Sequence, residues 1–277
     1  MRQTRIVCTI GPNSLDDSTL LALYGAGLSV ARLNGSHADL DWHRKAIRKI
    51  QEILPDVPIL LDIPGRKIRT TQLLHEPCFS AGDTLVLTTD TSHDGSRKVP
   101  VNYGDLHVDL SVGDTIMADD GTLRFSVIGI EGPDIHCRAE TAGQLKSRKG
   151  INVPFVRLNT PQVTSRDEQM IAFASENNVD FIGLSFVESA QHILAFRNLI
   201  NASSPRIVAK VENQGGMDNV HEIVEAADAI MIDRGDLSVE TSLYDVAIKQ
   251  KQIIDAARTH GRPVIVATEM LHTMIQN

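Results

Sequence analysis

Residues 206–236, RIVAKVENQGGMDNVHEIVEAADAIMIDRGD, contain the pattern that decides the fold. Two short runs rich in Ile and Val, 206–211 and 229–234, flank a longer amphipathic stretch at 217–226. A buried run, a helix and a second buried run are typical of the βαβ unit of a parallel sheet. This part of the chain therefore predicts two parallel strands joined by a crossover helix.

The same alternation extends over most of the chain and predicts seven buried strands with helices between them. The predicted strands are 6–11, 29–34, 58–63, 181–186, 206–211, 229–234 and 263–268. The predicted helices are 15–25, 38–53, 164–177, 190–202, 217–226 and 243–260, the third opening with Ser165 and Glu168 spaced as a capping box. Because a (β/α) barrel normally closes with eight strands, we predict an α/β, TIM-type (β/α) barrel that lacks the eighth strand.

Residues 71–149 interrupt this rhythm. Short segments of alternating apolar and polar residues are separated there by Gly, Asp, Asn and Ser, which is typical of strands joined by tight turns. We therefore expect an inserted all-β, barrel-like lid domain at 71–149, with the first part of the barrel at 1–70 and the second part at 150–277.

Composition and charge exclude several functional classes. Of the 277 residues, 42% are apolar and 22% charged, and no apolar run reaches the roughly 18 residues that would span a bilayer. The N-terminus has no signal-peptide pattern, so we expect a cytoplasmic protein without membrane contact. A net charge of −8 argues against nucleic acid as a partner. The three cysteines are dispersed and form neither a disulfide framework nor a CxxC metal motif.

Polar side chains inside the apolar strands gather at the C-terminal strand ends. They are Arg32, Asn34, Asp62, Lys210, Glu212, Asp236 and Thr268. In a (β/α) barrel these ends form the face on which active sites are built. The convergence of so many polar residues on one face predicts a functional site there, although ion pairs that merely fill the barrel mouth remain the simplest alternative for any one of them.

The spacing within this set indicates its chemistry. Lys210 and Glu212 are two residues apart, as are Arg32 and Asn34, so each pair faces the same side of its strand. Carboxylates such as Glu212 and Asp236 suit Mg²⁺ or Mn²⁺, which prefer oxygen ligands. Lys210 beside such a metal would favour a phosphate or a developing enolate.

Two further features lie near this face. Gly235 allows a backbone N–H to approach a carboxylate closely, although a glycine after a strand is often only part of a turn. Lys146, Arg148 and Lys149 lie where the insertion rejoins the barrel. This basic run is either a nucleotide phosphate contact or a solvated loop.

Eight segments, in order along the chain, resemble the motifs of the pyruvate kinase family. They are TRIVCTIGP at 4–12, VARLNGSH at 30–37, LDIPGRKIRT at 61–70, ADDG at 118–121, KGINVP at 149–154, AKVENQGGMDN at 209–219, IDRGDLSVE at 232–240 and RPVIVATEML at 262–271. The resemblance covers nearly the whole chain, and it implies phosphoryl transfer from phosphoenolpyruvate to ADP followed by protonation of enolpyruvate to pyruvate.

The resemblance also implies roles for individual residues. The residue matching Arg32 contacts the transferred phosphate, and those matching Glu212 and Asp236 hold the divalent metal. The lysine matching Lys210 stabilises the transition state.

The remaining roles that the resemblance implies concern the substrate carboxylate and the nucleotide. Thr268 and the backbone around Gly235 match positions near the substrate carboxylate and the protonated carbon. Arg69 and Lys149 match residues that bind the nucleotide and its phosphates.

Several residues depart from the family pattern. Lys67 stands where members that need K⁺ usually carry glutamate, and we expect its ammonium to replace K⁺, although Asn34, Ser36 and Asp62 keep the residue types that line the monovalent site. Asp233, Ser238 and Glu269 replace a small residue, a glycine and a glutamine. The sequence leaves open whether Asp233 faces the site or points outward.

Relative to the family, the chain lacks the eighth strand and the C-terminal domain that binds effectors and forms subunit contacts. We therefore expect no effector control through that domain. The open edge of the barrel predicts a homo-oligomer, or a partner that covers the edge.

Three functions remain open at this stage. The first is a pyruvate kinase-like phosphotransferase, which the retained Arg69, Lys149 and insertion favour. The second is a metal-dependent pyruvate or enolate aldolase or lyase. The third is a non-catalytic, truncated paralogue that binds phosphoenolpyruvate or a protein partner.

Overall fold

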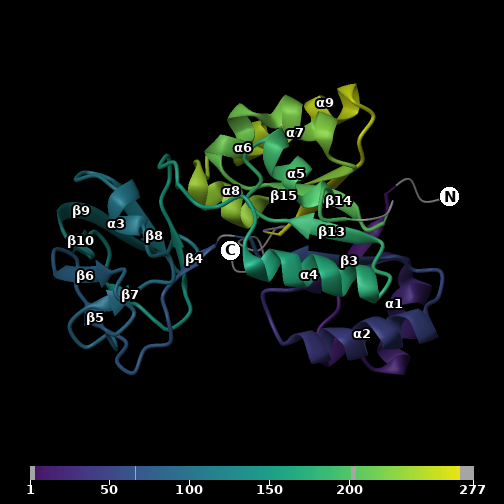
Figure 1. The fold of residues 1–277 in the computed structure, drawn as a ribbon, viewed down its shortest axis with the longest axis horizontal. Coiled ribbons are helices and arrows are strands. Elements are labelled where there is room, and N and C mark those ends of the chain that lie inside the picture. The colour runs from purple at the N-terminus through teal and green to yellow at the C-terminus, as the bar shows by residue number, and fades with distance from the viewer. Residues whose placement is uncertain (1–3, 66, 201–203, 269–277) are drawn as a thin grey trace.

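The computed structural model describes residues 4–65, 67–200 and 204–268, so the predicted departure at Glu269 lies outside the described residues. Figure 1 shows two bodies side by side: an α/β body in which helices surround a sheet, and an all-β body built from the middle of the chain.

The sheet of the α/β body has seven strands in the order β1-β2-β3-β13-β14-β15-β16, and all neighbours are parallel. They are β1 (Ile6–Thr9), β2 (Leu28–Asn34), β3 (Ile59–Ile63), β13 (Phe181–Leu184), β14 (Arg206–Val211), β15 (Ala229–Asp233) and β16 (Val264–Ala267). Each predicted strand is present, and the curved, nearly closed sheet confirms the barrel-type α/β fold. Within the described residues, β1 and β16 form the two edges of this sheet.

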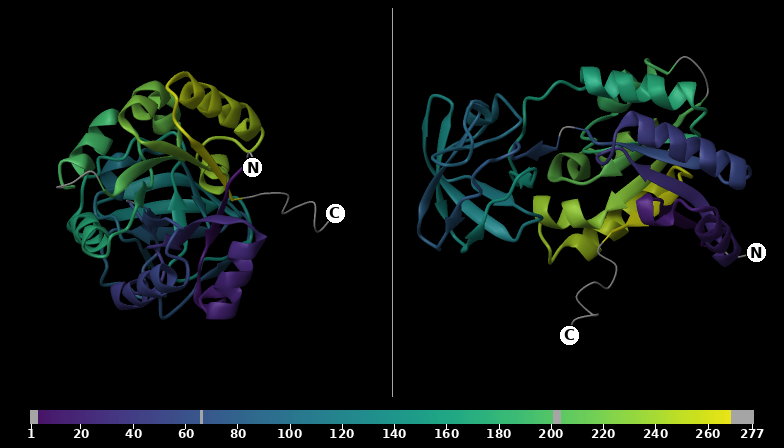
Figure 2. Two further views of the ribbon diagram at one scale, coloured as in Figure 1. Left: turned by 90° about the vertical axis from the view of Figure 1, so that its right-hand side faces the viewer. Right: turned by 90° about the horizontal axis from the view of Figure 1, so that it is seen from below.

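Helices cover the outside of this sheet (Figure 2). They are α1 (Asp17–Ala26), α2 (Leu40–Ile53), α4 (Ser165–Glu176), α5 (Ala190–Arg197), α6 (Gln214–Asp218), α7 (Val220–Ala226), α8 (Arg234–Glu240) and α9 (Val246–Thr259), with a 3₁₀ turn at Pro12–Ser14. The predicted helix at 217–226 is two helices, α6 and α7. In the described part of the chain, no helix has the length and apolar character needed to cross a membrane.

The capping box of α4 lies one residue earlier than predicted. Thr164, not Ser165, is the N-cap: its hydroxyl accepts a hydrogen bond from the Asp167 N–H, and the Asp167 carboxylate accepts one from the Thr164 N–H. The reciprocal bonds join the N-cap to the third helical residue, which here is Asp167 rather than Glu168. The helix therefore starts at Ser165 itself.

Helix α8 was not predicted, because the sequence placed a strand up to residue 234 and the next helix at 243–260. The chain passes from β15 into α8 between Asp233 and Arg234 without a loop. Gly235, Asp236 and Ser238 have low helix propensity, so the sequence carries little signal for this turn. A hydrogen bond from the Ser238 hydroxyl to the Gly235 carbonyl, 2.7 Å long, accompanies the first turn.

The all-β body contains a mainly antiparallel sheet with the order β4-β12-β8-β9-β10-β6-β7 and a separate β11-β5 pair. The strands are β4 (Ile68–Arg69), β5 (Cys78–Phe79), β6 (Thr84–Thr88), β7 (Val99–Pro100), β8 (Thr115–Ala118), β9 (Leu123–Glu131), β10 (Asp134–Ala139), β11 (Gly143–Gln144) and β12 (Gly150–Asn152), with a short helix α3 (Leu106–Asp109). Strands β4 and β12 lie just outside the expected 71–149. The division of the chain into domains at those residues stays a prediction.

The two bodies have separate cores. The barrel core packs strand residues such as Leu33 and Ile182 against helix residues such as Ile47. The β body buries its own cluster around Phe125 and Ile135. Both bodies line one cleft that is bordered by many polar side chains, and the candidate functional site lies there.

Gly183 links the fold to that site. In the parallel pair of β13 and β3, Gly183 lies opposite Asp62, and a Cβ on Gly183 would collide with the Asp62 Oδ1 atom. The glycine therefore leaves the space that the Asp62 carboxylate occupies.

We predict that Gly183→Ala lowers the free energy of unfolding by about 2 kcal/mol or more, because the added methyl must displace a buried carboxylate. Gly25→Ala is the matched control, since Gly25 lies on the exposed side of α1 with open space around it and alanine favours helix by up to about 1 kcal/mol. Denaturant unfolding measures both. Equal stability of the two variants would contradict the prediction.

Candidate active site

A layer of apolar side chains fills the inside of the barrel and supports the site. Its buried members are Leu60, Val208, Ala229 and Met231, with Val30 packed against them. Side chains two residues apart along a strand share a face. The next inward-facing layer toward the C-terminal strand ends is therefore polar, and it contains Arg32, Asp62, Lys210 and Asp233.

Lys210 occupies the centre of this polar layer, with only 6% of its side chain exposed. Its Nζ atom lies 2.6 Å from Glu212 Oε1 and 3.6 Å from both Asp62 Oδ2 and Asp233 Oδ2. It also donates a hydrogen bond to Ser185 Oγ at 3.1 Å. Burial alone would lower the pKa of Lys210, but the surrounding carboxylates outweigh it and raise the pKa above its usual range. Lys210 is therefore a fixed positive charge.

Arg32 is held beside Lys210 by Asp62. Its Nε and Nη2 atoms both donate to Asp62 Oδ2, at 3.0 and 2.6 Å, and Nη1 donates to Thr9 Oγ1 at 2.7 Å. Burial opposes the charge, yet Asp62, Asp233 and Glu212 raise the pKa of Arg32 further. Two cations, Arg32 and Lys210, thus share the Asp62 carboxylate and face one cavity.

Three carboxylates lie next to the two cations. Glu212, Asp233 and Asp236 each offer an oxygen, and these oxygens lie within 4.8 Å of one another. Glu212 is fully buried and accepts a hydrogen bond from the Phe186 N–H at 2.7 Å. Burial raises the pKa of Glu212 to about 7, against the lowering effect of Lys210. An all-oxygen donor set of this kind fits a hard divalent cation such as Mg²⁺ or Mn²⁺.

The structure answers the open question about Asp233, which faces the site. Its Oδ1 atom accepts the hydroxyl proton of Thr268 at 2.6 Å. The same Thr268 hydroxyl oxygen accepts a hydrogen bond from the Gly235 N–H at 2.9 Å. The predicted substrate residues Gly235 and Thr268 are therefore adjacent, and Asp233 joins them to Lys210.

The residues expected at the monovalent site lie in the same cavity. Asn34, Ser36, Asp62 and Lys67 all border it, and the Ser36 N–H donates to Asn34 Oδ1 at 3.1 Å. Lys67 Nζ lies 2.5 Å from Asp236 Oδ1, a predicted metal ligand. The idea that Lys67 replaces K⁺ stays a prediction.

The predicted nucleotide residues come from the β body and border the same cavity. Arg69 lies on β4, and its Nη1 donates to the Arg148 carbonyl at 3.3 Å. Lys149 directly precedes β12 and pairs with Asp119 at 2.6 Å. A hydrogen bond to Asp119 raises the pKa of Lys149. Positive side chains therefore face the barrel site from across the cavity.

One cleft of about 1170 Å³ brings these groups together. Its lining includes the predicted Arg32, Asn34, Ser36, Asp62, Lys67, Arg69, Lys149, Lys210, Gly235, Asp236 and Thr268, and Glu212 lies directly behind Lys210. Sequence reasoning missed Thr9 and Ser185, which bind Arg32 and Lys210. Both residues lie at the C-terminal ends of strands, and this position was the signal that the sequence offered. A single hydroxyl residue in a strand is common, so the signal was weak.

A model of the family described as "Pyruvate kinase, barrel domain" matches residues 1–277, the whole chain. The chain belongs to the pyruvate kinase family. Pyruvate kinases of Bacillus licheniformis and Geobacillus stearothermophilus are 40% and 39% identical to it over its full length. The pyruvate kinase of Mycobacterium intracellulare is 37% identical.

The chain spans only part of each of these pyruvate kinases. It covers 49% of the Bacillus and Geobacillus proteins and 60% of the Mycobacterium protein. The family relationship therefore applies to the barrel with its inserted β body.

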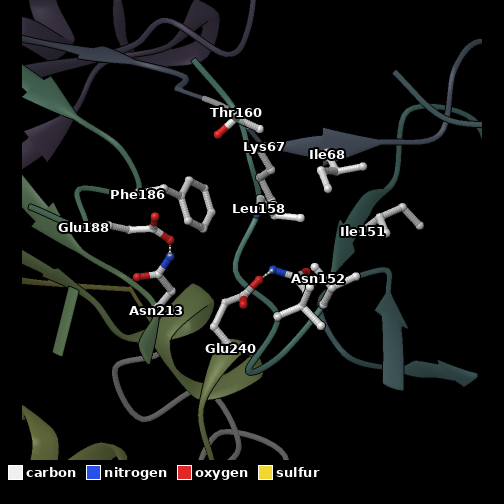
Figure 3. A pocket seen from close by; sticks show the side chains of 12 residues that line it. Lys67, Ile68, Ile151, Asn152, Leu158, Thr160, Phe186, Glu188, Asn213 and Glu240 are labelled. Carbon is white, nitrogen blue, oxygen red and sulfur yellow. Dashed lines mark hydrogen bonds between the residues drawn. The ribbon is translucent and has the colours of Figure 1, made fainter. Parts of the chain in front are cut away.

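A smaller cavity of about 40 Å³ lies beside the candidate site, between the barrel and the β body. Figure 3 shows two hydrogen-bonded pairs of polar side chains among its lining residues. Asn152 on β12 donates to Glu240 on α8 at 2.5 Å, and Asn213 donates to Glu188 at 2.6 Å. Burial raises the pKa of Glu240 to about 7, although the Asn152 hydrogen bond lowers it. Glu240 thus bridges the two bodies, and its burial shifts it toward the protonated form.

We predict that Glu240→Gln stabilises the chain at pH 8 but not at pH 4.5. Because folding raises the pKa of Glu240 from 4.5 to about 7, its contribution to stability is fully present below the lower value and is lost as the pH rises through the higher value. Glutamine removes this loss, which is on the order of 3 kcal/mol at most, and keeps an acceptor for Asn152.

Denaturant midpoints at the two pH values measure this effect. Glu176→Gln is the control, since it makes the same change at an exposed position. A Glu240→Gln variant that is less stable than the parent at pH 8 would show that the ionised Glu240 supports the fold instead.

Proposed function

We propose that the chain carries the substrate site of a pyruvate kinase-like phosphotransferase, which converts phosphoenolpyruvate and ADP to pyruvate and ATP. The observation that supports this most is the meeting of two kinds of group in one cleft. Lys210 and Arg32 lie beside the carboxylates of Glu212 and Asp236 on the barrel, and basic residues of the β body lie across from them.

In this proposal Arg32 binds the phosphate that is transferred. Asp62 fixes the guanidinium through Nε and Nη2, and Arg32 keeps further N–H groups for a phosphate oxygen. A planar guanidinium held this way orients the phosphate with little loss of side-chain freedom on binding.

Lys210 stabilises the charge that develops as the bond between phosphorus and the enol oxygen breaks. The buried ammonium is already positioned by Glu212 and Ser185, so it needs no reorganisation during the reaction. The phosphoryl group forms its new bond to a terminal phosphate oxygen of ADP, and the enolate accepts a proton at its methylene carbon to give pyruvate.

Glu212 and Asp236 would hold Mg²⁺ or Mn²⁺ in this scheme. The ion supplies neutralisation of the phosphate and enolate charges when bound. Thr268 and Gly235 form the wall against which the substrate carboxylate end lies, next to the carbon that is protonated.

Arg69 and Lys149 bind the nucleotide phosphates. This arrangement favours phosphoryl transfer over an aldolase or lyase reaction, because a carbon–carbon bond cleavage needs no second anionic substrate facing the barrel. Catalysis then depends on positioning and charge neutralisation rather than on covalent chemistry of the protein.

We predict that the chain forms pyruvate from phosphoenolpyruvate and that this reaction requires ADP and Mg²⁺. Lys210→Met and Glu212→Gln lower the rate by about 100-fold or more, because each removes a buried charge next to the reacting atoms. A coupled pyruvate assay measures the rate.

Lys251→Met and Glu176→Gln are the matched controls, since they make the same changes at exposed positions outside the cleft. Pyruvate release without ADP would instead support the lyase function. Binding of phosphoenolpyruvate with no pyruvate formed under any nucleotide would support the non-catalytic function.

We also predict that turnover does not need K⁺. Replacing K⁺ by tetramethylammonium leaves the rate of the parent chain within about twofold, because the Lys67 ammonium supplies the charge. Lys67→Glu makes the rate depend on K⁺ by about tenfold or more, since the cavity then lacks that cation. Strong activation of the parent chain by K⁺ would contradict this role of Lys67.

A further inference from the structure

Asp233 places an additional carboxylate in the site, where the family pattern has a small residue. It is 7% exposed and lies at the end of β15, facing the barrel interior. Its Oδ2 atom lies 3.6 Å from Lys210 Nζ, and its Oδ1 atom accepts the Thr268 hydroxyl proton. Asp233 therefore contacts both a cation of the site and a residue of the substrate wall.

The hydrogen bonds of Thr268 are directed within the protein. A hydroxyl has one proton, and that of Thr268 is donated to Asp233. The hydroxyl oxygen in turn accepts the Gly235 N–H. Two hydrogen-bond donors on this wall, the Thr268 hydroxyl and the Gly235 amide, are thus directed to acceptors of the chain itself.

The backbone conformation shows how firmly this arrangement is held. Thr268 has φ = +58°, a left-handed conformation that is costly for a β-branched residue. Its hydroxyl makes the two hydrogen bonds just described, and its carbonyl accepts a third from Arg234 Nε at 3.2 Å. Such a conformation persists only where several contacts hold it, so the direction of the Thr268 hydroxyl is well defined.

The charges in the site also act against a carboxylate at this wall. Glu212 and Asp236 can be neutralised by a divalent cation, whereas Asp233 Oδ1 is directed to Thr268 while its Oδ2 faces Lys210 at 3.6 Å. A carboxylate group of a ligand at this wall meets a like charge and loses the Thr268 hydroxyl as a donor. An uncharged group of the same shape does not meet this repulsion.

We propose that Asp233 is a specificity-determining residue that weakens the binding of a carboxylate at the Thr268–Gly235 wall. The site then discriminates against ligands with a negative charge at that end, relative to ligands with an uncharged polar group there. This inference rests on the proposed function, because it takes the substrate carboxylate end to lie against Thr268.

The test compares two ligands that differ only in this charge: pyruvate, and its amide pyruvamide. Their dissociation constants are measured by ligand-observed NMR in the presence of Mg²⁺. Asp233→Ala and the isosteric Asp233→Asn both tighten pyruvate binding by about tenfold or more, because each removes the like charge. Binding of pyruvamide changes by less than about threefold in the same variants.

Thr268→Val tests the second half of the proposal. Its effect on pyruvate affinity is several-fold smaller in the parent chain than in the Asp233→Ala background, because the parent hydroxyl is directed to Asp233. In the Asp233→Ala background it removes much of the gain, because the freed hydroxyl then binds the ligand. The effects of Asp233→Ala and Thr268→Val on the dissociation constant are therefore strongly coupled for pyruvate and weakly coupled for pyruvamide.

Several results would overturn the proposal: weaker pyruvate binding in both Asp233 variants, equal changes for both ligands, or no measurable pyruvate binding in any variant. Thermal unfolding of each variant shows that it is folded, and the Asn variant preserves the side-chain volume. ADP-dependent turnover is measured separately. A chain without turnover whose pyruvate affinity still shifts with Asp233 would contradict the proposed function but support this inference.

Discussion

The ion cluster around the buried Lys210 ammonium is the interaction on which the site depends. Taking a charge out of water is costly unless opposite charges and hydrogen bonds accompany it. Glu212, Asp62 and Asp233 provide those charges, each from a different strand or strand end. The order of the strands in the sheet therefore fixes which carboxylates reach the ammonium, and the cluster in turn fixes Arg32 through Asp62.

The barrel strands and most of the site were predictable from the sequence for one physical reason. A strand repeats every two residues, so an apolar residue facing the barrel interior identifies the residue two positions later as the next one on that face. Val208 and Lys210, or Leu60 and Asp62, follow this rule. The prediction that Lys210 and Glu212 share a face is confirmed by their 2.6 Å contact.

The same rule fails where the chain leaves the strand. The sequence left the orientation of the Asp233 side chain open, because its position was compared with that of Asp236. The chain turns into helix α8 between these two residues, so the two-residue repeat of a strand does not apply there. Contacts between the barrel and the β body were also beyond the sequence: Lys67 and Asp236 are 169 residues apart, and Asn152 and Glu240 are 88 apart. Such pairs depend on how two separately packed cores meet, which local patterns do not encode.

The two departures from the family pattern that meet in this cleft carry opposite charges. Lys67 Nζ lies 2.5 Å from Asp236 Oδ1, and Asp233 Oδ2 lies 3.6 Å from Lys210 Nζ. One positive and one negative side chain leave the formal charge of the cleft unchanged, but the two charges lie at different places. The negative charge lies against Thr268, whereas Lys67 lies where the barrel meets the β body. Opposite charges at different places alter the local field at each of them, so an effect confined to one end of a ligand is what this placement produces.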